Sequence, residues 1–491
     1  MKRFIALTVA ILITLNFVAC AEKESDNENN SEIISKTTTT AETTTITTTT
    51  TVTTTVATTT KKPETQKPVL TTTEQKEPVL EEKPELLPDI VLTNNELNWL
   101  AHYPITPVST AMPSYELEMF EEVYGGKVVE NVVSWNKRYT ELAKLIISGE
   151  SPDIFPAGDM DAFPKGVVLD LFQPVDDYID YDDKLWADVS DVADNFSVKD
   201  ECYVAVTDVL PASVCVYNRN LIMKNGYDDP ANLFKNGEWT LEAFYEMCKL
   251  DEDKSICGWW YSDAIQQTCG VPLIGMNENG VISNNMEKAE VKAVEDYMLN
   301  LAHDCSEYRD TAEIDTIESF KDGDCLFFPV GLWAIEDMNN VDYTESNISF
   351  VPMPKNTLDG NKTYHIGSII EGYLLCADAP NPDAFKAFVS CARACAIDEK
   401  IQLEKDAFRI ESYGWTNEMN GMYHIIKDMA LENPVFEMYR AISDDATSTF
   451  EQITGTTMWD FVIEKRTWND VIKDYKPTVD KFVDDVNQTL E

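Results

Sequence analysis

After residue 88, short apolar runs typical of strands alternate with stretches in which apolar residues have helical spacing. Short apolar runs typical of strands lie at 97–101, 127–133, 153–155, 204–206, 214–217, 325–330, 348–351 and 369–376. Helical spacing of apolar residues marks 114–123, 139–147, 240–250, 286–302, 383–396 and most of the chain after 434. This alternation predicts an α/β fold with largely parallel sheets. In such folds ligands bind beyond the carboxyl ends of the strands.

The first 19 residues have the pattern of a secretory signal peptide. Lys2 and Arg3 precede an apolar run over 4–18, which as a helix reaches only about 22 Å, short of a ~30 Å hydrocarbon core. The next residues, Phe17-Val18-Ala19-Cys20, resemble the lipobox of bacterial lipoproteins, with Phe17 where Leu is usual. That resemblance implies that Cys20 is lipidated and becomes the first residue of the mature chain. Plain secretion with an incidental cysteine is the alternative.

Residues 20–87 have the composition of a disordered linker. Positions 37–60 include 18 Thr among 24 residues, and 61–87 mix Pro, Lys and Glu without an apolar period. Such a segment cannot bury enough apolar surface to offset its ordering entropy. It is typical of an extended surface stalk, with O-glycosylation left open, that holds a domain away from a membrane. A tether that supplies only slack is the alternative.

The negative charge belongs to the body that follows the linker. The chain has 86 Asp+Glu and 39 Lys+Arg, a formal net charge of −47, and only 12 of these acids and 9 of these bases precede residue 88. No basic surface is available to displace counterions from phosphates, so we expect no nucleic-acid partner. The charge also disfavours a polybasic contact with anionic lipids.

Neither a metal nor a cofactor is expected. The body has ten cysteines but no CxxC pair, and its four histidines have no metal-ligand spacing. Cys202, Cys215, Cys325 and Cys376 lie in strand-like apolar runs, where a free thiol packs as a small hydrophobic group. The acidic run 176–194 lacks the glycine-centred spacing of a calcium loop, which favours a solvated face.

Six phrases, in order along the body, resemble those of extracellular solute-binding proteins of bacterial ABC importers. They are LAKLIISGESPD (142–153), FQPVDDYI (172–179), VCVYNRNL with GYDDP (214–230), GEWTLEAF (237–244), FKDGDCLFF through GLW (320–333) and VPMPK (351–355). In the fourth phrase the order of Trp and Thr departs from the family pattern. The resemblance fades after about residue 400.

This resemblance implies a two-lobed periplasmic-binding-protein-like fold of type II, with a hinge and a ligand cleft between the lobes. We expect 88–207 with 333–372 in lobe 1 and 208–332 with 373–491 in lobe 2, with crossings near 207–211, 333 and 372–377. The family delivers a small ligand, most often a carbohydrate, to ABC permease subunits. Together with the lipid anchor, it implies a location on the extracellular face of the membrane of a Gram-positive bacterium.

Candidate ligand-binding residues are acids and aromatics in loops after strands and at the crossings. Sugars present C–H faces that stack on aromatic rings and hydroxyls that need planar acceptors. Solvated loop carboxylates and core tryptophans are the alternative interpretation for each. The candidates are Tyr103, Asp159, Asp161, Asp208, Trp259, Trp260, Trp333, Glu371, Tyr373 and Trp415.

Two other classes of protein remain open. A cell-surface glycosidase also combines aromatics with paired carboxylates, although the sequence has no nucleophile elbow, HExxH, phosphate loop or Ser/His/Asp phrase. We therefore expect no catalytic residues. A surface adhesin would fit the stalk, but its expected repeats are missing from the sequence.

Overall fold

A computed structural model describes residues 83–108, 111–249, 254–257, 261–277, 279–304, 317–322, 325–336, 343, 347–360, 362–454 and 466–491. All of them belong to one compact unit of the chain. The predicted signal peptide, Cys20 and nearly all of the predicted linker lie outside the described residues, as do Trp259 and Trp260. No helix in the described ranges is both long and apolar enough to span a bilayer.

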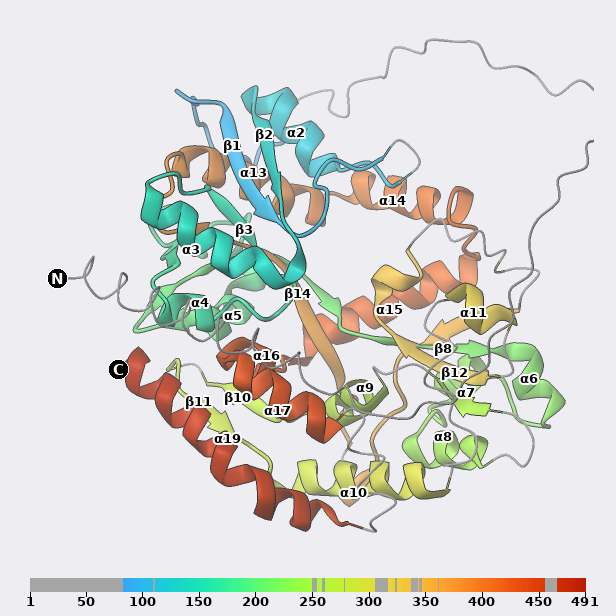
Figure 1. The fold of residues 1–491 in the computed structure, drawn as a ribbon. Coiled ribbons are helices and arrows are strands. Elements are labelled where there is room, and N and C mark those ends of the chain that lie inside the picture. The colour runs from blue at the N-terminus through green and yellow to red at the C-terminus, as the bar shows by residue number, and fades with distance from the viewer. Residues whose placement is uncertain are drawn as a thin grey trace, which may run out of the picture. The chain divides into compact units, whose positions relative to one another are not determined.

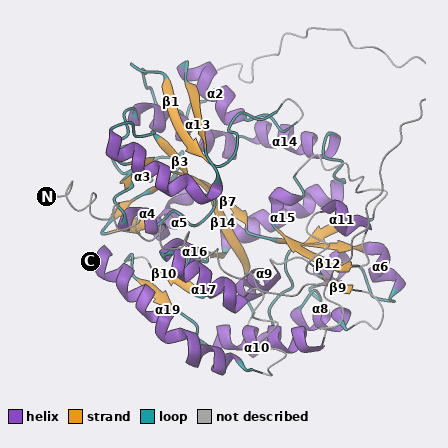
Figure 2. Ribbon diagram, in the orientation of Figure 1, coloured by secondary structure: helices purple, strands orange, loops and turns teal. Residues whose placement is uncertain are grey.

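The helices and strands follow the predicted order closely (Figures 1 and 2). The helices are α2 (Tyr115–Tyr124), α3 (Arg138–Ser148), α4 (Lys165–Val168), α5 (Ser190–Ala193), α6 (Arg219–Lys224), α7 (Pro230–Asn236), α8 (Leu241–Cys248), α9 (Tyr261–Gln266), α10 (Ala289–Asp304), α11 (Ile317–Asp322), α13 (Pro382–Ile397), α14 (Glu399–Glu411), α15 (Asn417–Glu432), α16 (Tyr439–Ile442), α17 (Asp444–Thr454) and α19 (Trp468–Leu490). The predicted start of α8 is confirmed, because the Thr240 hydroxyl accepts a hydrogen bond from the Ala243 amide.

Seven strands form the larger sheet. Its main order is β15 (Pro434–Val435), β14 (Ile366–Cys376), β3 (Ile154–Pro156), β1 (Glu96–Ala101) and β2 (Lys127–Val132). Strands β4 (Phe172–Gln173) and β7 (Val204–Pro211) pair with β14 as well. Strand β1 runs parallel to both β2 and β3. Helix α13 packs on α2, β7 and β1, and so covers this sheet.

A second sheet has the order β13 (Ile348–Val351), β8 (Val214–Asn218), β12 (Cys325–Val330) and β9 (Lys254–Ile256). Helix α6 packs on β12 and β8, α7 on β13 and α8 on β9. Two short hairpins complete the strands, β5 (Ser197–Val198) with β6 (Glu201–Cys202) and β10 (Ile274–Met276) with β11 (Ile282–Asn284). Helix α19 packs on β11 and α10.

The expectation of largely parallel sheets is wrong, because both sheets are mixed. Strand β14 is antiparallel to β3, β4 and β7, and β8 is antiparallel to β12 and β13. The reason lies in the path of the chain. It leaves the larger sheet along β7, enters the smaller sheet within two residues, and returns along β14. The outgoing and returning strands run in opposite directions and pair antiparallel.

The points where the chain crosses between the two sheets can be compared with the predicted crossings. The chain changes sheets at 212–213, between β7 and β8, and again within 352–365, between β13 and β14. The first change lies next to the predicted crossing at 207–211. Trp333 instead follows β12 within the smaller sheet's segment, and Gly372 lies inside β14. The predicted lobe boundaries stay a prediction, although Ile348–Val351 pairs with the smaller sheet and Tyr373 with the larger one.

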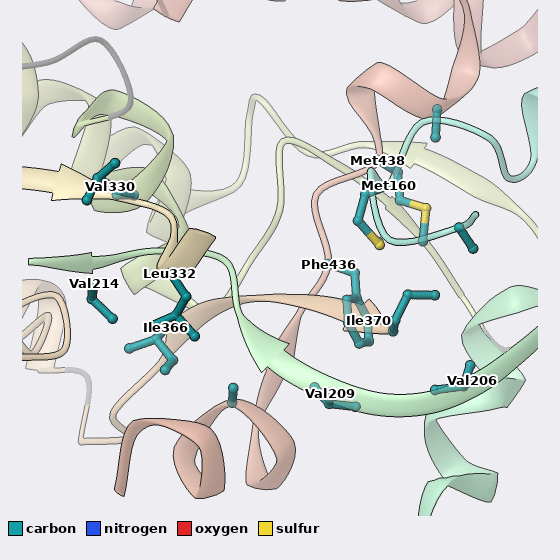
Figure 3. Close-up of a cluster of buried hydrophobic side chains, with 14 of the residues drawn as sticks. Met160, Val206, Val209, Val214, Val330, Leu332, Ile366, Ile370, Phe436 and Met438 are labelled. Carbon is teal, nitrogen blue, oxygen red and sulfur yellow. The ribbon is translucent and has the colours of Figure 1, made fainter. Parts of the chain in front are cut away.

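An apolar cluster lies where the two sheets meet (Figure 3). One end of it is formed by Val214 of β8, Val330 of β12, Leu332 just after β12, and Ile366 of β14. Each of these side chains is at most 6% exposed. The cluster continues through Val206 and Val209 of β7 and Ile370 of β14 to Phe436, Met438 and Met160. Burial of this size anchors the crossing strands, because apolar area removed from water stabilises by about 25 cal/mol per Å².

The cysteines behave as core residues. The nine that the structure describes are all buried, and none of these nine forms a disulfide bond. Cys202, Cys215, Cys325 and Cys376 lie in β6, β8, β12 and β14, as the apolar runs predicted. Burial raises the pKa of Cys215 and Cys376, so these thiols remain neutral at physiological pH.

Candidate functional site

The candidate site begins at the carboxyl ends of three parallel neighbours, β3, β1 and β2. Asp159 follows β3, His102 and Tyr103 follow β1, and Trp135 follows β2. Because parallel strands end at the same edge of a sheet, these loops converge. The fold therefore brings an acid, an imidazole and two aromatic rings together from three loops spread over more than 50 residues of the chain.

Three rings form a row along this edge. The His102 ring lies 4.6 Å from that of Trp135 and 4.8 Å from that of Tyr103, and is nearly perpendicular to both. Trp135 is 43% exposed and Tyr103 40%. Single exposed rings are common on protein surfaces, whereas exposed apolar groups that lie next to one another often mark a binding site. The row gives the edge of the sheet an aromatic surface suited to the C–H faces of a sugar.

The Trp135 ring is held from behind by a buried guanidinium. The Arg138 guanidinium lies 3.2 Å from the ring centroid and donates a 2.7 Å hydrogen bond to the Trp135 carbonyl. Arg138 is only 2% exposed and forms an ion pair with Asp161, which also accepts a 2.8 Å hydrogen bond from the Tyr139 hydroxyl. Asp161, a predicted ligand contact, is thus engaged within the protein. In this structure it positions the arginine beneath Trp135.

Asp159 and His102 face one another without a hydrogen bond. Asp159 Oδ2 lies 3.5 Å from His102 Nδ1, and neither buried atom has a hydrogen-bond partner among the described residues. Burial and the nearby Asp161 charge raise the pKa of Asp159 to about 6, although Arg138 and Arg440 act in the opposite direction. A ligand hydroxyl reaching these atoms would satisfy both of them.

A cavity of about 300 Å³ lies beside Tyr103. Polar groups from several elements line it: Glu116 of α2, Thr207 of β7, Glu371 and Tyr373 of β14, and Lys405 of α14. The three predicted residues Tyr103, Glu371 and Tyr373 therefore meet in one place. The Tyr373 ring packs edge-on against Trp99 and Phe388, each 5.3 Å away, which fixes its orientation. Its volume lies at the lower end of the range found for small-molecule sites.

A β-bulge directs Glu371 into the cavity. Glu371 pairs with Asp208 and Gly372 pairs with Val206, so Thr207 is an extra residue on β7. The Thr207 hydroxyl donates a 3.1 Å hydrogen bond to the Glu371 carbonyl, and Arg393 of α13 donates a 2.7 Å hydrogen bond to the Thr207 carbonyl. Arg393 therefore holds the irregular strand in place.

Other predicted residues have different surroundings. Asp208 forms an ion pair with Lys427 of α15, so it joins a hinge strand to a helix. Trp415 is 2% exposed and donates a 3.0 Å hydrogen bond to the Ile335 carbonyl, which makes it a core residue rather than a surface for stacking. Trp333 is 64% exposed and does not line the cavity, so its contact with ligand stays a prediction.

Five residues of the site were not predicted from the sequence: Trp135, His102, Glu116, Arg138 and Lys405. Trp135 and His102 could have been found, since each follows a predicted strand as Asp159 does. Glu116, Arg138 and Lys405 lie in helices, where no periodicity marks a side chain that points at a cavity. In the described ranges, no group of three His, Cys, Asp or Glu side chains could hold a metal ion.

Comparison with known proteins places this geometry in a family. The model of the bacterial extracellular solute-binding protein family matches residues 106–393, more than half of the chain. A comparison with curated proteins found no match.

Solved structures share the fold at low sequence identity. The GacH receptor of Streptomyces glaucescens, solved unliganded and with acarbose, is 14% identical with a TM-score of 0.56, over 79% of this chain and 98% of its own. An ABC substrate-binding protein of Listeria monocytogenes in complex with cycloalternan is 16% identical, with a TM-score of 0.54 over 80% and 98%. A binding protein of B. animalis subsp. lactis in complex with β-1,6-galactobiose is 16% identical, with a TM-score of 0.51 over 78% and 97%.

The crossing strands, the two mixed sheets and the family match agree with one another. The chain belongs to the bacterial extracellular solute-binding protein family.

Proposed function

We propose that this protein is the substrate-binding component of an ABC importer and that its ligand is a sugar or oligosaccharide. The observation that carries the proposal is the row of Trp135, His102 and Tyr103 beside a polar cavity. The rings supply stacking surfaces, and Asp159 and Glu371 supply planar acceptors. The three solved structures above are of proteins with sugar-type ligands, which supports the same choice.

Binding would close the lobes around the ligand. We propose that the lobes follow the two sheets and that the hinge lies at 212–213 and 352–365. A ligand that contacts both lobes favours the closed state by its differential affinity, and the permease subunits would recognise that state.

A panel of sugars tests the proposal directly. The purified protein is mixed with neutral mono- and oligosaccharides of different linkages, and its melting temperature is followed. Saturating ligand at about 100 times its Kd stabilises by roughly 2.7 kcal/mol, which raises the melting temperature measurably. If no sugar in the panel raised the melting temperature, the sugar assignment would be contradicted. A rise with peptides or polyamines alone would replace that assignment.

The same samples separate binding from catalysis. We propose that the protein releases its ligand unchanged, although Asp159 and Glu371 are two carboxylates beside one tyrosine. A glycosidase with such a pair would convert the ligand to smaller sugars. Chromatography after long incubation should return the starting sugar, and any shorter product would identify an enzyme.

We also propose that lipid on Cys20 anchors the protein to the extracellular face of the membrane. The diacylglycerol-plus-amide anchor of bacterial lipoproteins provides the several acyl chains that stable binding needs. Replacing Cys20 with Ser should move the protein from the detergent phase to the aqueous phase in a Triton X-114 partition of expressing bacteria. Equal partition of both proteins would contradict the anchor.

A further inference from the structure

In the part of the chain that the structure describes, the cavity beside Tyr103 is lined by charged side chains that form no ion pairs with one another. Glu116, Glu371 and Lys405 line it together. Among the described residues, neither the Glu371 carboxylate nor the Lys405 ammonium has a hydrogen bond or an ion pair within the protein. The Glu371 side chain is exposed to the cavity, and Lys405 is half-buried. Both groups are therefore available to a ligand.

The neighbouring charges outside the cavity are already paired. Asp208 has Lys427 as its partner, and Asp161 has Arg138. Although Glu371 is exposed to the cavity, desolvation by the surrounding cavity walls raises its pKa, with Lys405 acting in the opposite direction and Asp208 in the same one. Burial alone would lower the pKa of Lys405, but the charges of Glu371 and Glu116 raise it. Two carboxylates thus surround a single ammonium, and the cavity is on balance negative.

We propose that this cavity selects its ligand by charge. Glu371 accepts a hydrogen bond from one hydroxyl of an uncharged sugar, and Lys405 donates a hydrogen bond to a neighbouring hydroxyl. Sugars that carry a carboxylate or a phosphate are rejected. The proposal rests on the sugar-binding function proposed above. An anionic group beside Lys405 would share the same small cavity with Glu116 and Glu371, where like charges repel strongly. Glu371 and Glu116 are in this way the specificity-determining residues, and Lys405 offsets part of their repulsion.

A matched pair of ligands tests this selection. The first is the neutral oligosaccharide that binds most tightly in the panel, and the second is the same compound with its primary alcohols oxidised to carboxylates. Isothermal titration calorimetry gives both affinities for the wild type, Glu371→Gln and Lys405→Met. Lys400→Met is the control, because Lys400 is an exposed lysine at the start of the same helix.

The wild type should bind the neutral sugar roughly tenfold or more tightly than its oxidised form. Glu371→Gln should lower the ratio of neutral to oxidised affinity severalfold, Lys405→Met should raise it, and Lys400→Met should leave it unchanged. If Glu371→Gln does not fold, Glu116→Gln removes the second carboxylate and should narrow the ratio in its place. If the neutral sugar bound tightly but the ratio of the two affinities were the same in all variants, charge selection would be overturned while the sugar-binding function would stand. If no neutral sugar bound, both proposals would fall.

Discussion

Replacing Trp135 with Ala should weaken sugar binding by about 10- to 100-fold, the usual effect of removing an aromatic anchor at a binding surface. One face of the ring lies against the Arg138 guanidinium, and His102 meets the ring nearly at a right angle. The remaining surface is exposed at the edge of the sheet where the site residues converge. The loss should be enthalpic and visible by calorimetry.

The control for this substitution is Ile147→Ala. Ile147 is a half-exposed apolar residue near the end of α3, the helix that follows Trp135. It does not line the cavity, so its removal should leave the affinity unchanged. If both variants bound as the wild type does, Trp135 would not be part of the site. If Ile147→Ala alone lost affinity, the ligand would lie elsewhere on this lobe.

Replacing Arg393 with Met should lower the free energy of unfolding by about 3 kcal/mol, because buried acceptors lose their donor. Arg393 is 2% exposed. Its guanidinium donates to the carbonyls of Leu185 and Thr207, at 2.9 and 2.7 Å, and forms an ion pair with Asp188. The two carbonyls would remain buried, whereas Asp188 is largely exposed and would be hydrated.

The same variant should also bind sugar less tightly. Arg393 holds the bulged residue Thr207, whose hydroxyl contacts the Glu371 carbonyl, so its loss allows Glu371 to move away from the cavity. Lys386→Met removes a positive charge from the same helix and serves as the control in urea unfolding. A stable Arg393→Met with unchanged affinity would show that the bulge keeps its shape without the arginine.

The fold was largely predictable because its elements have strong local patterns. The apolar runs of β12 and β13 are fully buried strands, and Thr240 caps α8 as its position before an apolar period suggested. The direction of pairing was not predictable in the same way. Antiparallel contacts of β14 depend on the return of the chain from the other sheet, and no local pattern in 366–376 encodes that return.

The site was predictable in part from the position of Glu371 and Tyr373 near an expected crossing of the chain, and otherwise only where a residue follows a strand. Tyr103 and Asp159 were found by that rule, and Trp135 obeys the same rule. Asp161 and Trp415 have the chemistry of ligand contacts, yet both are engaged within the protein. Asp161 forms an ion pair with Arg138, and Trp415 donates a hydrogen bond to the Ile335 carbonyl. Lys405 reaches the cavity only because α14 packs beside α13. Such partners come from tertiary packing, which composition and spacing do not reveal.

The distance between the two lobes tests the central claim most directly. Spin labels on noncanonical residues at Val129, exposed on β2 of the larger sheet, and Met223, exposed on α6 beside the smaller sheet, report that distance without using the buried cysteines. In double electron–electron resonance, the distance should shorten as neutral sugar is added and should saturate at the affinity found by calorimetry. An unchanged distance at saturating sugar would contradict a binding protein that closes on its ligand.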